Sequence, residues 1–241
     1  DVTIRKLTKV PATQAVGVPA PLQRHLVEAD VTALLRGVDG IGGKIRFLLD
    51  VLLDAKGKLP KLKKQRYFLF ANKVANMPGT IRLVKPNALA QWSASNDALV
   101  RAITREAVQI DAPQAVTGVT NAFHSAGSVP GEGDTQIFLS STGGQPYSIS
   151  ISSRSGQPKR WSVSTSELIE EGASAPKRQT LIWYRLACGL PSELSEAHLE
   201  SSDAAIWSDT GVMKVQFPIT VQVLPLDGAV VESEGVETGE P

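Results

Sequence analysis

Tyr-Ser-Ile-Ser-Ile-Ser, residues 147–152, is the stretch that decides the fold class of this 241-residue chain. Successive side chains of a β-strand point to opposite faces of the sheet. Strict alternation of apolar residues with serine therefore predicts a half-buried strand with one apolar face and one face of hydroxyl groups.

Further strand candidates lie on both sides of this stretch. They are residues 135–139, 160–164, 180–187 and 212–224. Turn-like sequences at Thr142–Pro146 and Ser155–Pro158 separate residues 147–152 from the strands predicted at 135–139 and 160–164. Short strands with turns at this spacing favour an antiparallel β-sandwich or barrel in the C-terminal half of the chain.

The N-terminal half has a mixed pattern. Residues 22–36 fit a short helix that ends at Gly37, and residues 45–53 and 66–70 fit two strands of a hairpin. Residues 96–110 predict the clearest helix, capped by Asn96 or Asp97, and residues 111–134 are typical of a loop. The predicted fold class is therefore α+β, with a β-rich C-terminal half and a few short helices, mainly in the N-terminal half.

This pattern also predicts the organisation of the chain into segments. A basic mixed α/β segment covers residues 1–111, and a β-rich segment covers residues 112–229. The two are expected to pack as one domain or as two closely joined domains. An acidic tail follows at residues 230–241.

Charge is divided between the two halves of the sequence. Residues 1–105 carry 18 Lys/Arg and 7 Asp/Glu, a net charge of +11. Residues 106–241 carry 7 Lys/Arg and 17 Asp/Glu, a net charge of −10. A basic half attracts polyanions, and a chain with two oppositely charged halves can also attract its own copies.

Several kinds of chemistry lack their sequence signature. The three histidines, His25, His124 and His198, are too far apart for a local metal-binding pair, and the single Cys188 excludes an intramolecular disulfide. The glycine run at 37–44 departs from the phosphate-loop spacing, and the nucleophile elbow Gly-x-Ser-x-Gly is absent. No cofactor, metal site or membrane span is expected, and an enzyme with a site assembled from distant residues stays open.

A basic cluster is the strongest functional lead. It comprises Lys56, Lys58, Lys61, Lys63, Lys64 and Arg66, and Tyr67 follows at once. Lysine and arginine neutralise phosphates, and exposed aromatic rings stack on bases. The cluster therefore predicts contact with single-stranded nucleic acid. The alternative is a solvated loop whose aromatic residues point into the core.

Aromatic residues next to arginine suggest a second kind of contact. Trp161 follows an arginine, and Trp183-Tyr184-Arg185 combines all three residue types that dominate interface hot spots. These four residues are predicted to lie at an oligomer interface.

The function predicted from these features is that of a non-enzymatic structural subunit. It would belong to a larger assembly, such as a coat, whose basic half contacts nucleic acid. Three alternatives stay open: a monomeric nucleic-acid-binding module, an extracytoplasmic binding or envelope-assembly domain with Asp1 as a processed N-terminus, and an enzyme. The partners expected are further copies of the chain or other subunits, and single-stranded nucleic acid.

Overall fold

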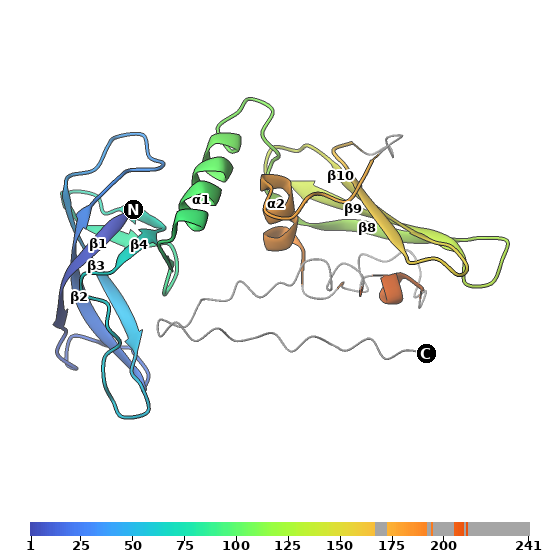
Figure 1. Cartoon of the computed structure of the whole chain (residues 1–241). Helices are drawn as coiled ribbons and strands as arrows, with labels where there is room; N and C mark the ends of the chain where they lie inside the picture. The colour runs from blue at the N-terminus through green and yellow to red at the C-terminus, as the bar shows by residue number, and fades with distance from the viewer. Residues whose placement is uncertain (167–172, 192–193, 195–204, 210, 212–241) are drawn as a thin grey trace. The chain divides into compact units, whose positions relative to one another are not determined.

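The structure, a computed structural model, describes residues 1–166, 173–191, 194, 205–209 and 211. It forms two compact units (Figure 1), of which unit 1 is described over residues 1–98 and unit 2 begins at residue 99. Helix α1 (Ala94–Glu106) crosses this boundary. Helices long and apolar enough to span a membrane are not found among the described residues.

Unit 1 consists of short antiparallel strands around one core. They are β1 (Val2–Lys9), β2 (Leu22–Val31), β3 (Lys44–Leu52), β4 (Arg66–Leu69), β5 (Ala71–Lys73), β6 (Ile81–Leu83) and β7 (Leu89–Gln91). Five of them form a sheet in the order β3-β2-β1-β4-β7, and β5 pairs with β6. The Arg46 amide of β3 donates to the Gly79 carbonyl at 2.8 Å, which joins the edge of the larger sheet to the segment before β6.

Alternation along β3 explains how this core forms. Ile45, Phe47, Leu49 and Val51 are buried, whereas the residues between them point outward. Because neighbouring strands share this register, the inward residues of β1 and β2 meet those of β3 in a single cluster. Burial of aliphatic and aromatic side chains supplies about 1.5–3 kcal/mol per residue towards folding.

Unit 2 contains one antiparallel sheet and a helix that packs on it. Its elements are β8 (Val116–Ala126), β9 (Gly133–Ser141), β10 (Tyr147–Ser153), β11 (Arg160–Ser164) and α2 (Leu181–Gly189), with the strand order β11-β10-β9-β8. Tyr147, Ile149 and Ile151 are 0% exposed and form a core with Leu186 of α2. The strand predicted from the serine alternation is confirmed in position and in its buried face.

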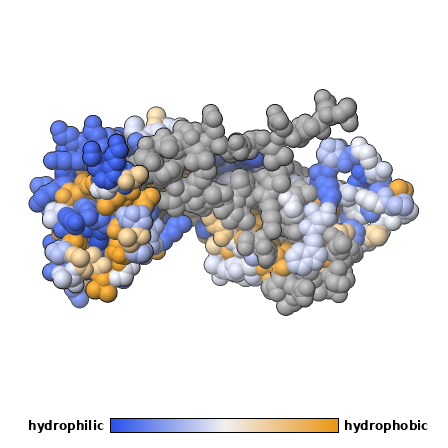
Figure 2. All heavy atoms as spheres, turned by 90° about the horizontal axis from the view of Figure 1, so that it is seen from below, coloured by the Kyte–Doolittle hydropathy of each residue, from blue (hydrophilic) through white to orange (hydrophobic). Residues whose placement is uncertain are grey.

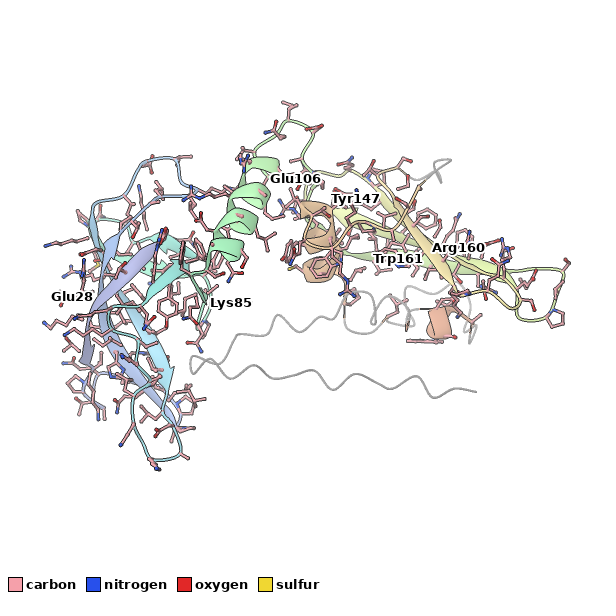
Figure 3. The ribbon with its side chains drawn as sticks, viewed as in Figure 1. Glu28, Lys85, Glu106, Tyr147, Arg160 and Trp161 are labelled. Atoms are coloured by element: carbon pink, nitrogen blue, oxygen red, sulfur yellow. The ribbon has the colours of Figure 1, made fainter. Side chains whose placement is uncertain are left out.

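Helix α2 begins where its free amide groups find oxygen acceptors. The Thr180 hydroxyl accepts from the Trp183 amide at 3.4 Å, and the Glu106 carboxylate accepts from the Leu181 amide at 3.1 Å. Glu106 lies at the C-terminal end of α1 (Figure 3). A hydroxyl cap and a carboxylate at the first turn both stabilise a helix N-terminus.

The predicted fold class is wrong in where it places strands and helices. Residues 1–91 contain seven strands and no described helix, so β-structure is not concentrated in the C-terminal half. Helices α1 and α2 are short, with 13 and 9 residues, and α2 lies in the C-terminal half of the chain. The chain is strand-rich with antiparallel sheets, and unit 2 shows a helix on its sheet where a sandwich would have a second sheet.

Four local predictions fail for identifiable reasons. Residues 22–31, expected in a helix, form β2 because they pair with strands on both sides. Residues 181–189, expected in a strand, form a helix because packing on the sheet overrides the strand preference of Trp and Tyr. Strands β3 and β4 are real but are not a hairpin, since β2 and β1 lie between them. The cap of α1 is the Ser93 hydroxyl, which accepts from the Asn96 amide at 3.1 Å.

The expected loop at 111–134 contains the 11-residue strand β8. Two register shifts interrupt its pairing with β9, so its buried residues Val116, Val119 and Ala122 lie three positions apart. A β-bulge adds a residue to one strand and hides the two-residue period. The strand predicted at 212–224 and the acidic tail at 230–241 lie outside the described residues.

We expect the three tyrosines to resist ionisation in the folded protein. Burial raises the pKa of Tyr67, Tyr147 and Tyr184 above the ordinary tyrosine value, because it disfavours the charged phenolate. Absorbance at the tyrosinate band should therefore stay low at a pH of about 10, where free tyrosine is half ionised.

The unfolded chain would release these protons first, so the free energy of unfolding should fall as the pH rises above about 10. A titration in denaturant gives the reference curve. An ordinary tyrosine titration in a protein that is still folded by circular dichroism would contradict this expectation.

Candidate nucleic-acid interface

The basic cluster lies on the loop that joins β3 to β4, residues 53–65, named here the lysine loop. Its first half is a tight turn organised by Asp54. One Asp54 carboxylate oxygen accepts from the amides of Lys56 and Lys58 at 2.8 and 2.7 Å. Gly57 has a φ of +71°, a conformation that glycine adopts without steric cost. The two lysines therefore flank the tip of an ordered turn.

The second half of the lysine loop is attached to the core. Leu62 is 1% exposed and belongs to the core cluster of unit 1. The Lys64 amide donates to the Ile4 carbonyl at 2.8 Å, and the Ile4 amide donates to the Gln65 carbonyl at 3.0 Å. These contacts fix the backbone directly after Leu62, and the lysine side chains are exposed to solvent.

All five lysines of the loop are solvent-exposed: Lys56, Lys58, Lys61, Lys63 and Lys64. None of them forms an ion pair within the part of the chain that the structure describes. The loop thus presents uncompensated positive charge, with its backbone held in place at both ends. Like charges this close also repel one another, which favours a bound anion.

Arg66 and Tyr67 have a different environment from the lysines. The Arg66 guanidinium donates to both carboxylate oxygens of Asp1, at 2.8 Å from Nε, and lies 4.1 Å from the centre of the Trp92 ring. Tyr67 is 4% exposed, with its ring in the core of unit 1. Both side chains are engaged inside unit 1, and the exposed aromatic residue near the loop is Phe70, at 46%.

The residues predicted at an oligomer interface lie in unit 2. Trp161 and Trp183 are half-buried and pack against the core of that unit. Trp183 and Tyr184 form an edge-to-face pair with ring centres 5.0 Å apart, and Arg185 Nε donates to the Pro113 carbonyl at 3.2 Å. Figure 3 shows Trp161 beside the exposed Arg160 on β11. Each of these side chains thus has contacts within unit 2.

The described polar groups of unit 2 include one buried network. The Thr135 hydroxyl donates to the Asp209 carboxylate, which also accepts from Lys159, and His124 Nδ1 lies 2.9 Å from the same hydroxyl. Asp209 and Thr135 are both buried. The network attaches residues 205–209 to the sheet, and a substrate would have no access to the Thr135 oxygen.

The described residues contain no cluster of three or more His, Cys, Asp or Glu side chains that could hold a metal ion. His25 is buried, with Nδ1 3.1 Å from the Gln23 carbonyl, and Cys188 is exposed. His198 lies outside the described residues.

No protein-family model matches the chain, and comparisons with curated proteins and with solved structures give no match.

Proposed function

We propose that this protein is a non-enzymatic subunit of a larger assembly and that it contacts single-stranded nucleic acid through the lysine loop. The observation that carries the proposal is the set of five exposed lysines on one anchored loop, without ion-pair partners among the described residues. A phosphate backbone offers closely spaced negative charges that such a loop can neutralise.

The surrounding charge distribution supports this site. Residues 1–98 carry 16 Lys/Arg and 7 Asp/Glu, and they fold together as unit 1. On the sheet of this unit, several cationic side chains are already paired: Arg5 with Asp30, Lys6 with Glu28 and Arg24 with Asp50. Among the described residues, the lysine loop concentrates five unpaired lysines in nine residues, whereas the other unpaired lysines of unit 1, such as Lys9, Lys44 and Lys85, are scattered along the sequence, so an approaching polyanion would be attracted to the loop.

An exposed apolar patch on the same unit supports the assembly part of the proposal. Leu48 and Leu52 of β3 are each 52% exposed, and they pair in register with Leu26 and Leu22 of β2. Figure 2 shows apolar surface next to hydrophilic surface on unit 1. The Arg24–Asp50 ion pair lies between the two leucine pairs on this face, so the surface combines exposed apolar side chains with one paired charge, as protein–protein interfaces commonly do.

We expect neutralisation of the lysine loop to weaken RNA binding in a salt-dependent way. The variant replaces Lys61, Lys63 and Lys64 by glutamine, and labelled oligouridylate is titrated by fluorescence anisotropy. Each phosphate contact on a single strand contributes about 0.7 to the slope of log K against log salt, so the slope should become shallower by about 2.

The matched control replaces Lys9, Lys44 and Lys85, three exposed lysines elsewhere on unit 1, by glutamine. It removes the same charge and should keep most of the slope. Equal losses in the two variants would show that net charge, and not the loop, determines binding. RNA affinity that is insensitive to salt in the unmodified protein would contradict the proposed nucleic-acid contact altogether.

We expect the mass in solution to depend on the leucine patch. Light scattering at low and high salt, with and without RNA, should show species larger than one chain. Replacing Leu48 and Leu52 by glutamine should shift them towards the monomer, because glutamine removes the apolar contact. The control is Val129→Ala, an exposed residue of unit 2. A strict monomer under all conditions would contradict the assembly part of the proposal.

A further inference from the structure

The outward face of the unit 2 sheet has an unusual composition. Ser148, Ser150 and Ser152 of β10 lie on the side of the strand opposite the core residues. Ser150 and Ser152 are partly exposed, whereas Ser148 is 1% exposed and donates to the Ser166 carbonyl at 3.0 Å. Their partners across the strands are Phe138, Gln136 and Asp134 of β9 and Ser164, Ser162 and Arg160 of β11. Serine is not among the β-branched and aromatic residues that strands favour. The small side chains of Ser150, Ser152 and Ser162, all partly exposed, leave a shallow, flat floor.

Two aromatic rings stand at the side of this floor. Phe123 of β8 pairs with Gln136, and Asn121 pairs with Phe138. The rings of Phe123 and Phe138 have centres 5.8 Å apart and planes inclined by 30°, and both residues are half-buried. Two neighbouring rings on the outward side of a sheet provide an apolar platform next to hydroxyl and amide groups.

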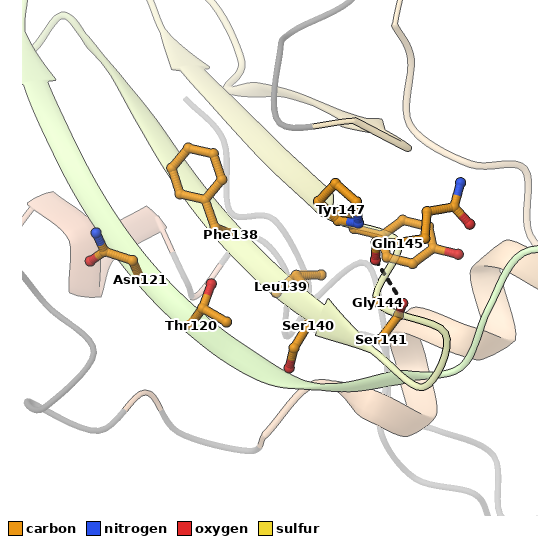
Figure 4. Close-up of a pocket in the computed structure, with 10 residues that line it drawn as sticks. Thr120, Asn121, Phe138, Leu139, Ser140, Ser141, Gly144, Gln145 and Tyr147 are labelled. Carbon is orange, nitrogen blue, oxygen red and sulfur yellow. Dashed lines mark hydrogen bonds between the residues drawn. The ribbon is translucent and has the colours of Figure 1, made fainter.

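A hollow of about 360 Å³ adjoins the platform at the turn between β9 and β10 (Figure 4). Phe138 lines it together with Thr120, Asn121, Ser140, Gly144 and Gln145. This volume lies within the range of about 300–1,000 Å³ that small-molecule sites occupy. The polar lining consists of hydroxyl, amide and backbone groups, with no charged side chain among the lining residues.

The centre of the face has hydrogen-bonding capacity that the described residues do not use. The side chains of Gln136, Ser150 and Ser162 make no hydrogen bond to another described residue. The charged groups lie at one end of the face, where Asp134 accepts two hydrogen bonds from Arg154, at 3.0 and 3.1 Å. A ligand over the centre would thus meet donors, acceptors and aromatic carbon, but no net charge.

We infer that this face and its hollow bind a neutral oligosaccharide. A sugar ring presents apolar C–H groups on its flat side, which pack on an aromatic ring, and hydroxyl groups at its edge. Gln136, Gln145, Ser150 and Ser162 can donate to and accept from such hydroxyls. A nucleic acid is disfavoured here, because its phosphates would find no cation at the centre of the face. The site is separate from the lysine loop and independent of the proposed function.

The test titrates the full chain with cellohexaose, chitohexaose and maltohexaose by isothermal calorimetry. We expect saturable binding of at least one sugar, unchanged between about 50 and about 200 mM salt, since no phosphate is neutralised. Phe138→Ala should weaken this binding about tenfold through loss of the ring contact. The control Phe70→Ala removes an exposed phenylalanine of unit 1 and should leave the affinity unchanged.

A second variant, Ser150→Arg, places a charged, bulky side chain at the centre of the face without removing a core residue. It should also weaken sugar binding, and it keeps the test valid if Phe138→Ala unfolds. Absence of binding to all three sugars at millimolar concentration would overturn the inference. So would binding that neither variant weakens, or an affinity for oligouridylate that depends on Phe138 while sugar binding does not.

Discussion

Gly189→Ala is expected to destabilise unit 2 by about 3 kcal/mol or more. In an exposed helix the same change would stabilise the protein by about 0.4–1 kcal/mol, because alanine restricts the unfolded chain. Here α2 approaches β8 so closely that an added Cβ would lie 2.3 Å from the Val116 carbonyl oxygen and 2.6 Å from its Cβ. The conflicting oxygen belongs to backbone in a paired strand, so it cannot rotate away.

Urea unfolding followed by tryptophan fluorescence measures this effect, since Trp161 and Trp183 report on the core of unit 2. The matched control is Gly118→Ala in β8, where the nearest atom to the added Cβ is the Ser140 hydroxyl oxygen at 4.0 Å. It should change the free energy of unfolding far less than Gly189→Ala does. Equal stability of the two variants would mean that α2 can move away from β8 at little cost.

Packing of α2 against the sheet also explains why the sequence predicted a strand and not a helix at this position. The pattern around Tyr147–Ser152 sufficed for β10, since a strand with one wet face has a period that is visible locally. The helix α2 has no such signal. It is short, rich in aromatic residues, and stabilised by its packing on the sheet and by Glu106, which is distant in sequence.

Unit 1 shows the same limit at β2. Residues 22–31 have apolar residues at positions that suit either a helix or a strand, and pairing with β1 and β3 decides between them. Strand pairing is a long-range property, so no local window contains it. The strand predictions at 45–53 and 66–70 are confirmed in position, and both stretches contain β-branched or aromatic residues, but their partners were not predictable.

The candidate site was partly predictable for a similar reason. Exposure of the five lysines follows from their density, because so many cations cannot be buried together. The environment of Arg66 depends on Asp1 and Trp92, which are near in space and far in sequence. That of Tyr67 depends on the pairing of β4 with β1 and β7. The serine alternation in β10 predicted a polar outward face on this strand. The two phenylalanines beside it, Phe123 and Phe138, lie on β8 and β9, whose register only the structure gives.

Leu62→Ala is expected to destabilise unit 1 by about 3 kcal/mol, within the range measured for buried leucines. Leu62 is 1% exposed, and the backbone around it is fixed by hydrogen bonds to Ile4, so the cavity has little chance to collapse. The control is Leu59→Ala in the same loop. Leu59 is 39% exposed, so its truncation should cost no more than about 0.5 kcal/mol.

The same pair of variants tests whether anchoring of the lysine loop matters for binding. At a temperature where both variants remain folded, Leu62→Ala should lower the affinity for oligouridylate, because the loosened loop must be ordered on binding. Its slope of log K against log salt should stay unchanged, since every lysine is retained and the number of neutralised phosphates is the same. A shallower slope in Leu62→Ala would mean that the lysines no longer contact the same phosphates. An affinity equal to that of Leu59→Ala would show that the lysines act as freely moving charges, for which the buried leucine has no role in binding.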